Sequence, residues 1–453
     1  MNCELEKELY RLYTQHSGIT TDSRNCPADS IFLALKGESF DGNQFAAQAL
    51  EKGCAVAIVD NPAVAVDDRY VLVDDCLAAY KAIAREHRRQ FDIPVLAVTG
   101  TNGKTTTKEL IAAVLKEEYN VLYTEGNFNN DIGVPKTLLR LTAEHDIAVI
   151  EMGASHPGDI KTLAETAEPT CGLITNVGRA HLEGFGSFEG VVRTKTELYD
   201  YLRTRDEGLV FINVDDEVLM DCISDDDTLW LSPYTTDPAG FSDCISGILN
   251  KDSQLMAMKW REPLALLEQE QRSTKWHKVQ THLVGAYNIY NVLAAVAVGI
   301  NFGLSHRQIC HALESYVPTN NRSQLVETAS NRLIVDAYNA NPSSMAAALD
   351  NFSLVDAPKK MAVLGSMLEL GSESRAEHQR VVDRLAQMNL DALWLVGHEF
   401  GSDAVDLSQL PGVRVFADVN EVKAAIEASK PEGYTILIKG SNGKRLFELP
   451  PLL

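Results

Sequence analysis

The feature that most constrains this fold is an apolar strand that runs into a glycine loop and then into a helix. Residues 95–98 are consecutive apolar residues, which suits a strand buried on both faces of a parallel sheet. Gly100 and Gly103 follow, and apolar residues recur at helical spacing over 110–115. A helix that begins there directs backbone N–H groups and the positive end of its dipole at an anion. We therefore predict a phosphate-binding loop.

The residues after the second glycine fit this prediction. Lys104 supplies a mobile positive charge, and the Thr105 hydroxyl can bind Mg²⁺ as in nucleotide triphosphatases. Val98 is a departure, because it stands where the pattern G-x-x-x-x-G-K-[ST] has its first glycine. A chance glycine turn is the alternative interpretation. A second Gly-x-x-Gly-Lys run at 440–444 is followed closely by prolines, so we expect no helix and no phosphate site there.

Length and charge limit the possible classes of protein. A chain of 453 residues is expected to form three domains, at roughly 150 residues each. A net charge of −22 argues against nucleic acid and anionic membranes as partners. The eight cysteines are scattered without a C-x-x-C pair, which favours reduced thiols in a cytoplasmic protein. The N-terminus is unlike a signal peptide and asparagines interrupt the apolar window 284–304, so no membrane insertion is expected.

Strands and helices alternate along the chain, which predicts an α/β fold with three domains. Residues 1–92 are predicted to form a small α/β domain, and residues 93–316 show the βαβ rhythm of a doubly wound parallel sheet. The pattern restarts after this stretch, so residues 317–453 are predicted to form a Rossmann-like third domain. Weak alternation over 217–283 is interpreted as an antiparallel insertion in the central domain.

Ligands of such sheets gather at the carboxyl ends of the strands, where several polar residues are predicted. Glu151 ends one strand and could bind Mg²⁺ together with Thr105, with a solvated carboxylate as the alternative. His181 follows the next strand in a glycine-rich loop, although a lone histidine is more often structural. Lys195 lies on a predicted helix, and by pattern alone it would be a surface lysine.

Polar residues beyond the central strands could complete a nucleotide site. Asn288 and Asn291 lie three apart on one helical face, where their amides could meet an adenine edge. Arg322 could reach a phosphate, and Asp336 could accept hydrogen bonds from ribose hydroxyls.

Two polar loops stand out in the first domain, at 20–24 and 36–43. Their Asp, Ser, Gly and Asn residues are typical of ordinary turns. Arg24, Lys36 and the neighbouring hydroxyl groups would also suit a diphosphate. The residues alone leave both interpretations open.

Six runs together resemble the Mur ligases of bacterial cell-wall synthesis. They are residues 100–105, 126–135, 151–154 and 181–187, the pair 288 and 291, and residues 338–342. The match spans all three predicted domains. Within the family, the Asn-x-Asn-Asn-x-Ile-Gly-x-Pro run at 127–135 and the Tyr-Asn-Ala-Asn-Pro run at 338–342 are similar to the members that add D-Ala-D-Ala.

The resemblance implies a role for each matching residue. The ATP phosphates would bind at Gly100, Thr101, Asn102, Gly103, Lys104, Thr105 and Thr106. Adenine would face Asn288 and Asn291, and phosphate and ribose would face Arg322, Asp336 and Asn339. The magnesium ions, two in all, would be served by Thr105, Glu151, His181 and a carbamate on Lys195, and the catalytic residues would be Lys104, Glu151, His181 and Lys195. The acceptor substrate would bind at Ser23, Arg24, Lys36, Asp41, Gly42, Asn127, Asn129, Asn130 and Ser155.

The implied reaction is ATP-dependent amide formation in peptidoglycan precursor synthesis. The substrates would be UDP-N-acetylmuramoyl-tripeptide and D-Ala-D-Ala, and the enzyme is expected to be a monomer. Two departures leave the dipeptide pocket open: Ser366 stands where an aspartate is expected, and Val335 precedes Asp336 where a second acid is often found. On resemblance, His378 would belong to that pocket. The alternatives are a ligase that adds a single amino acid to a muramoyl peptide or glutamate to folate, or a nucleotide switch of another class.

Overall fold

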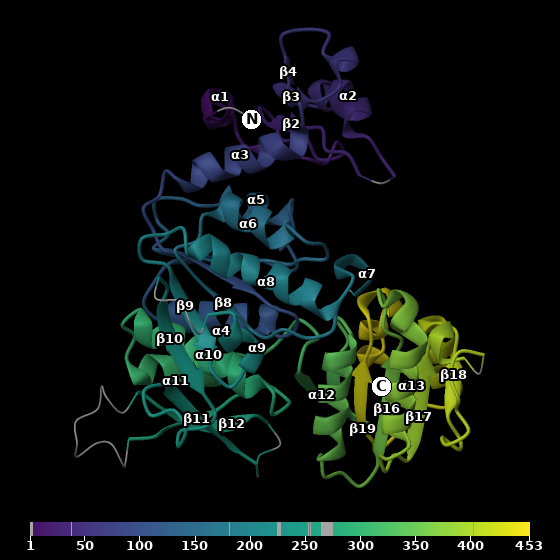
Figure 1. The fold of residues 1–453 in the computed structure, drawn as a ribbon. Helices are drawn as coiled ribbons and strands as arrows, with labels where there is room; N and C mark the ends of the chain where they lie inside the picture. Colours follow the sequence, from purple (N-terminus) through teal and green to yellow (C-terminus); the bar gives the residue numbers. More distant parts are fainter. Residues whose placement is uncertain are drawn as a thin grey trace. The chain divides into compact units, whose positions relative to one another are not determined.

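The computed structural model describes most of the chain, and its ribbon is shown in Figure 1. The described residues are 3–37, 39–180, 182–223, 228–251, 253, 255–263, 275–401 and 403–453. They group into two compact units, namely unit 1 (Met1–Ala97, Tyr119–Ala154 and Gly158–Cys171) and unit 2 (Val98–Glu118, Ser155–Pro157 and Gly172–Leu453). None of the helices within these ranges combines the length and the apolar character needed to cross a membrane.

The first sheet lies in unit 1 and has the strand order β1-β2-β3-β4, with every pairing parallel. Its strands are β1 (Ile19–Thr20), β2 (Ile31–Leu33), β3 (Val56–Val59) and β4 (Tyr70–Leu72). Its helices are α1 (Cys3–Thr14), η1 (Gly42–Phe45), α2 (Ala46–Glu51), η2 (Pro62–Val64) and α3 (Cys76–Arg88). The apolar side chains of β2, β3, α2 and α3 form one buried core.

The central sheet has nine strands in the order β13-β12-β11-β10-β9-β8-β5-β7-β6. They are β5 (Val95–Thr99), β6 (Val121–Tyr123), β7 (Ile147–Glu151), β8 (Cys171–Ile174), β9 (Leu209–Asn213), β10 (Trp230–Thr235), β11 (Ile245–Asn250), β12 (Ala257–Arg261) and β13 (His277–Gln280). The helices are α4 (Lys104–Leu115), α5 (Gly133–Leu138), α6 (Asp159–Ala167), α7 (Leu182–Phe185), α8 (Phe188–Leu202), α9 (Glu217–Asp221), α10 (Asn288–Asn301) and α11 (His306–Ser315).

The insertion predicted at 217–283 is antiparallel only in part. Strands β10 and β11 continue the sheet in parallel with β9, whereas β12 pairs antiparallel with both β11 and β13. Neither β10 nor β11 alternates regularly between buried and exposed residues, so alternation in the sequence could not indicate these parallel strands.

Helix α3 joins the first sheet to the two helices α5 and α6 within unit 1. Arg88 Nε donates to the Ala167 carbonyl oxygen at 3.3 Å, and Arg89 forms an ion pair with Glu168 at 2.5 Å. These contacts fix the end of α3 against the end of α6.

The third sheet has the order β14-β15-β19-β16-β17-β18, with only β14 antiparallel. Its strands are β14 (Gln324–Glu327), β15 (Arg332–Asp336), β16 (Lys360–Gly365), β17 (Ala392–Val396), β18 (Arg414–Phe416) and β19 (Thr435–Lys439). Its helices are α12 (Pro342–Ser353), η4 (Gly371–Glu373), α13 (Ser374–Leu385), η5 (His398–Phe400), α14 (Val419–Ala428), η6 (Asn442–Lys444), η7 (Leu446–Glu448) and η8 (Pro450–Leu452).

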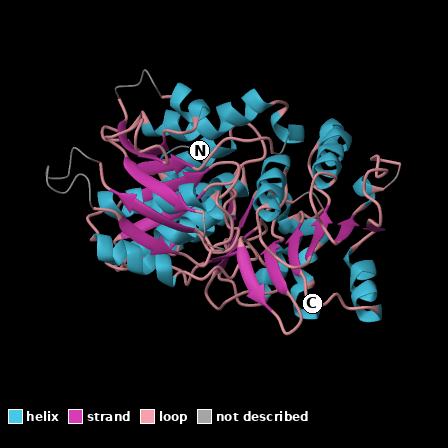
Figure 2. Ribbon diagram, turned by 90° about the horizontal axis from the view of Figure 1, so that it is seen from below, coloured by secondary structure: helices cyan, strands magenta, loops and turns pink. Residues whose placement is uncertain are grey.

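Both faces of the third sheet are covered. Ile334 packs with α12 and α13 on one face, whereas Leu333 and Val335 pack with α14 on the other. Figure 1 shows α12 and α13 across the first of these faces, and Figure 2 shows helices on both sides of the strands near the C-terminus. Because both faces are buried, polar residues can gather only at the strand ends.

Candidate active site

The two glycines of the predicted phosphate loop are required by their surroundings. Gly100 has a φ of +136°, and an added Cβ would lie 2.1 Å from Thr175 Oγ1. Gly103 has a φ of +81°, precedes the first residue of α4, and would place a Cβ 2.6 Å from Asn291 Oδ1. Val98 is a fully buried residue of β5, so the strand simply continues where other phosphate loops have a glycine. The loop therefore begins at Gly100.

The strand end after β8 holds the main chain of this loop. Asn102 N–H donates to Asn176 Oδ1 at 3.1 Å, and Asn176 Nδ2 donates to the Asn102 carbonyl oxygen at 3.0 Å. Thr175 Oγ1 donates to the same carbonyl at 2.6 Å, and Thr101 N–H donates to the Asn176 carbonyl at 2.9 Å. The role of Asn176 was not predicted from the sequence, because these contacts link residues far apart in the chain.

The cation and hydroxyl groups of the loop lie at the start of α4. Lys104 Nζ donates to the carbonyl oxygens of Gly100 at 2.7 Å and Thr101 at 3.0 Å, so its ammonium lies across the loop. Thr105 and Thr106 are both buried in the first turn of α4. This arrangement combines a lysine, a hydroxyl and a helix N-terminus, which together suit nucleotide phosphates.

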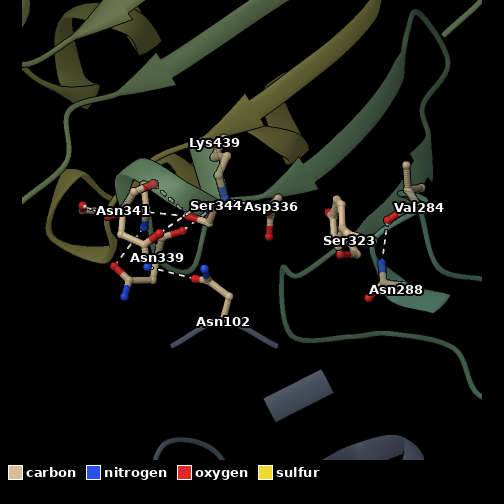
Figure 3. Close-up of polar contacts among 12 residues, drawn as sticks. Asn102, Val284, Asn288, Ser323, Asp336, Asn339, Asn341, Ser344 and Lys439 are labelled. Atoms are coloured by element: carbon tan, nitrogen blue, oxygen red, sulfur yellow. Dashed lines mark hydrogen bonds and ion pairs between the residues drawn. The ribbon is translucent and has the colours of Figure 1, made fainter. Parts of the chain in front are cut away.

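Asn288 and Asn291 form a hydrogen-bonded chain at the start of α10. Asn288 Nδ2 donates to the Val284 carbonyl oxygen at 2.8 Å, as Figure 3 shows, and Asn291 Nδ2 donates to Asn288 Oδ1 at 2.8 Å. Thr107 Oγ1 donates to Asn291 Oδ1 at 3.0 Å. Asn291 thus supports Gly103 and α4 directly, while contact with adenine stays a prediction.

The third sheet contributes a charged group at its carboxyl edge. Lys439 Nζ, on a lysine that is almost fully buried, forms an ion pair with Asp336 Oδ2 at 2.5 Å (Figure 3). Asn339 Oδ1 accepts from the Ala340 N–H at 2.9 Å. Lys439 was missed by sequence analysis, although a lysine that ends an apolar strand is a usable signal. The roles of Asp336 and Asn339 toward ribose and phosphate stay predictions.

Arg322 lies at the start of this third part with its guanidinium over the Tyr338 ring, at 3.9 Å from the centroid. Its Nε is buried and has no hydrogen-bond partner among the described residues. Such a donor is usually satisfied by a ligand or water. The contact of Arg322 with a phosphate stays a prediction.

Glu151 is buried at the end of β7 in unit 1. Its Oε1 accepts from Asn129 Nδ2 at 2.7 Å, and its N–H donates to Thr124 Oγ1 at 2.9 Å. The alternative of a solvated carboxylate is therefore wrong. Since a metal-binding carboxylate is commonly oriented by a second polar group, Asn129 suits that supporting position.

The remaining asparagines of the 127–135 run shape the backbone. Asn130 Oδ1 accepts from the Gly133 N–H at 2.8 Å at the start of α5, and the Asn127 carbonyl accepts from the Asn129 N–H at 2.8 Å. The contacts of Asn127, Asn129 and Asn130 with an acceptor substrate stay predictions.

Lys195 is buried on α8, in contrast to the surface position that pattern alone suggests. Its Nζ lies 5.6 Å from the centre of the Phe185 ring. The signal was present in the sequence, because Val191 and Leu198 place Lys195 on an apolar helical stripe. His181 lies outside the described residues.

Ser155, which is also predicted to bind the acceptor substrate, lies in unit 2 and packs closely on α7. Its carbonyl oxygen would lie 2.0 Å from a Cβ added to Gly184, and its hydroxyl lies 3.1 Å from His156 Nδ1. Gly184 is thus required by this approach, and the substrate contact of Ser155 stays a prediction.

The first predicted acceptor loop is held by Asp22. Arg24 donates to its carboxylate from Nε at 2.8 Å and from Nη2 at 2.9 Å, and these bonds lower the pKa of Asp22 to about 2. Ser23 supplies its carbonyl oxygen to Lys52 Nζ at 2.8 Å. The Arg24 side chain is 87% exposed, so it is accessible to a ligand.

The second predicted acceptor loop contains a bridge between Lys36 and Asp41. Lys36 Nζ pairs with Asp60 at 2.7 Å, which raises the pKa of Lys36. A Cβ added to Gly42 would lie 2.5 Å from the Leu35 carbonyl oxygen, so only glycine fits there. Turn geometry thus explains much of this composition, and the substrate contacts of Lys36, Asp41 and Gly42 stay predictions.

His378 has both ring nitrogens engaged in the third part of the chain. Nδ1–H donates to the Ser374 carbonyl at 2.7 Å, and Nε2 accepts from the Met367 N–H at 3.0 Å. Burial lowers the pKa of His378, so the neutral imidazole is favoured. This arrangement supports a structural role for His378, and its place in a dipeptide pocket stays a prediction. Ser366 nearby is fully buried.

Three family models match the chain in order. "Mur ligase family, catalytic domain" matches residues 15–90, "Mur ligase middle domain" residues 98–299, and "Mur ligase, glutamate ligase domain" residues 321–442. The chain is 35% identical over 431 residues to the UDP-N-acetylmuramoyl-tripeptide–D-alanyl-D-alanine ligase of Synechocystis, covering 94% of this chain and 89% of the relative. The chain belongs to the Mur ligase family.

Other Mur ligases match over nearly the whole chain. The Escherichia coli protein of the same name is 35% identical over 440 residues, covering 95% of this chain and 92% of the relative. A crystal structure of MurF from Acinetobacter baumannii is 30% identical, has a TM-score of 0.84 and covers 99% of this chain and 97% of its own. MurF from Thermotoga maritima in complex with ADP, 24% identical, shares the fold with a TM-score of 0.81, covering 96% of each chain. The three-domain α/β prediction is confirmed, while the domain limits stay predictions.

Proposed function

We propose that this chain joins D-alanyl-D-alanine to the terminal carboxylate of UDP-N-acetylmuramoyl-tripeptide with consumption of ATP. Relatives that carry this name match more than nine-tenths of the chain. The observation that carries the proposal is the glycine loop at 100–103 with Lys104 at the start of α4, in a chain that resembles these relatives over most of its length. A cytoplasmic location and a monomeric state stay predictions from the sequence.

The proposed chemistry proceeds in two steps. The tripeptide carboxylate attacks the γ-phosphorus of ATP, which forms an acyl phosphate and releases ADP. The amine of the dipeptide then attacks the acyl carbon, loses a proton, and phosphate leaves as the amide forms. Phosphorylation is needed because a carboxylate oxygen is a poor leaving group. The chain's share is to position the reactants and to balance negative charge.

Lys104 is the residue best placed to balance this charge. Its ammonium now contacts two loop carbonyls, Gly100 and Thr101, and can exchange these for phosphate oxygens without leaving the loop. The fixed backbone of the loop and the α4 N-terminus add further donors. Arg322, with its buried Nε, supplies a second cation from the third part of the chain.

Each unit offers, taken by itself, a group suited to Mg²⁺, which prefers oxygen ligands and keeps phosphate and water in its shell. Thr105 offers a hydroxyl and Glu151 a buried carboxylate that Asn129 orients. The described residues contain no cluster of three or more histidine, cysteine, aspartate or glutamate side chains that would bind a metal alone. When bound, the ion supplies charge stabilisation at the transferred phosphoryl group.

We further propose that Lys195 carries a carbamate. Lys195 is buried on α8, and the neutral form of a lysine amine adds CO₂ to give an anionic carbamate with release of one proton. A carbamate offers two oxygens, which suit Mg²⁺ better than an ammonium does.

Phosphate release in the presence of ATP and Mg²⁺ tests the function. We expect release only when a UDP-muramoyl tripeptide and D-Ala-D-Ala are both present, with the pentapeptide product detected by mass spectrometry. Release with a single amino acid in place of the dipeptide would indicate a related ligase. Release that needs neither acceptor would indicate a nucleotide switch, and would refute the proposal.

A further inference from the structure

The side chain of Asn341 joins the third part of the chain to the phosphate loop. Asn341 is the N-cap residue of α12, where its Oδ1 accepts from the Ser344 N–H at 2.8 Å. Its Nδ2 donates to Asn102 Oδ1 at 2.9 Å. Figure 3 shows this contact between two asparagines that lie on different elements.

The orientation of the Asn341 amide is fixed by the hydrogen-bond partners of its oxygen and nitrogen. A backbone N–H can only donate, so the oxygen of Asn341 must face Ser344. The capping box is completed by Ser344 Oγ, which accepts from the Asn341 N–H at 3.1 Å. Asn341 is 7% exposed, so water offers little alternative. The nitrogen of the amide is therefore held toward Asn102.

This nitrogen in turn fixes the Asn102 amide. Because Asn341 Nδ2 can only donate, Asn102 must present its oxygen to it. The Asn102 backbone is held on both sides by Asn176, so the residue cannot turn away. Its Nδ2 makes no hydrogen bond to any other described residue. The donor edge of this amide is thus left for a ligand of the loop.

We propose that Asn341 is a positioning residue for the nucleotide: it orients Asn102 so that Asn102 Nδ2 donates to a phosphate oxygen of ATP or ADP. This inference rests on the proposed binding of nucleotide phosphates at the glycine loop. It gives the third part of the chain a direct effect on phosphate affinity through a single amide.

The substitution Asn341→Asp tests this role. Aspartate caps a helix as well as asparagine does, so α12 keeps its N-cap. The carboxylate has no donor, and Asn102 is expected to rotate its amide to donate to it. Asn102 would then present an oxygen to the phosphates in place of an N–H. A hydrogen bond to a charged group would be replaced by repulsion, which we expect to weaken ADP binding by at least about tenfold.

The substitution Asn341→Ser separates orientation from charge. Serine also caps a helix, adds no charge, and is too short to hold Asn102. We expect a smaller loss of ADP affinity, of about threefold to tenfold, because the Asn102 amide becomes free to rotate. Asn61→Asp is the matched control: Asn61 caps η2 by accepting from the Ala63 N–H at 3.0 Å, and lies in unit 1. The Asn61→Asp variant should bind ADP with the affinity of the unchanged protein.

The readout is the dissociation constant for ADP, measured by calorimetry on the full chain, together with the thermal midpoint without nucleotide. If Asn341 had a purely structural role, Asn341→Asp and Asn341→Ser, which both preserve the helix cap, would bind ADP with the affinity of the unchanged protein. If Asn341→Asp binds ADP with the affinity of the unchanged protein, the inference is overturned. It is also overturned if Asn341→Asp loses ADP affinity and Asn341→Ser loses none. If the unchanged protein fails to bind ADP, the proposed nucleotide site itself is wrong. In the ligase assay, KM for ATP should rise while KM for D-Ala-D-Ala stays constant.

Discussion

Replacing Gly103 by alanine gives a direct test of the loop geometry. The residue has a φ of +81°, where a side chain costs about 1–2 kcal/mol. The new Cβ would also lie 2.6 Å from Asn291 Oδ1, and displacing Asn291 breaks its hydrogen bonds to Thr107 and Asn288. At about 1 kcal/mol for each bond, the total loss in unfolding free energy is roughly 3–4 kcal/mol.

Gly158 offers a matched control. It is also an N-cap residue, of α6, with a φ of +89°, but nothing lies within 4 Å of an added Cβ. Gly158→Ala should therefore lose only the backbone part, about 1–2 kcal/mol.

The comparison uses urea unfolding followed by far-ultraviolet circular dichroism, together with ADP binding. We expect Gly103→Ala to be destabilised by at least about 1 kcal/mol more than Gly158→Ala and to lose ADP affinity. Equal destabilisation of the two variants would show that the contact between the new Cβ and Asn291 does not lower the unfolding free energy. Unchanged ADP affinity in Gly103→Ala would show that phosphates do not use this loop.

Three further predictions concern single side chains. Lys104→Ala should lower turnover by about 10² to 10³ with the fold intact, as measured by phosphate release and circular dichroism, and an unchanged turnover number would exclude it from catalysis. Lys195→Ala should regain activity with added short carboxylates, and the unchanged enzyme should depend on bicarbonate; the absence of both effects would exclude a carbamate. The lowered pKa of His378 means that the unfolded chain binds the proton more readily, so unfolding free energy should fall as pH drops below about 6.5. His378→Gln should reduce the slope of unfolding free energy against pH, as measured by urea unfolding. An unaltered slope would show that other groups cause the pH dependence.

The phosphate loop was predictable because its determinants are local. An apolar strand, two glycines, Lys104 and a helical stripe lie within a short stretch, and each has a direct effect on backbone geometry. The buried Glu151 was also predictable as a strand-end carboxylate, although its burial was not. Lys195 lay on an apolar stripe, so its burial could have been read from the sequence.

The supporting contacts could not be predicted in the same way. Asn176 meets Asn102 across 74 residues, and Asn341 meets it across 239. An asparagine is common in turns and caps, so its residue type alone does not indicate which distant backbone it holds. Such contacts depend on strand order, which the hydrophobic pattern leaves open.

The junction of α3 with α6 has a consequence for recombination between relatives. Arg88 and Arg89 anchor α3 to Ala167 and Glu168, so the first domain shares an interface with a helix encoded much later in the chain. A chimera that exchanges only residues 1–92 would separate these partners, and the buried Arg88 would face a mismatched surface. Exchange of this first domain therefore requires that α6 and its last turn be inherited with it.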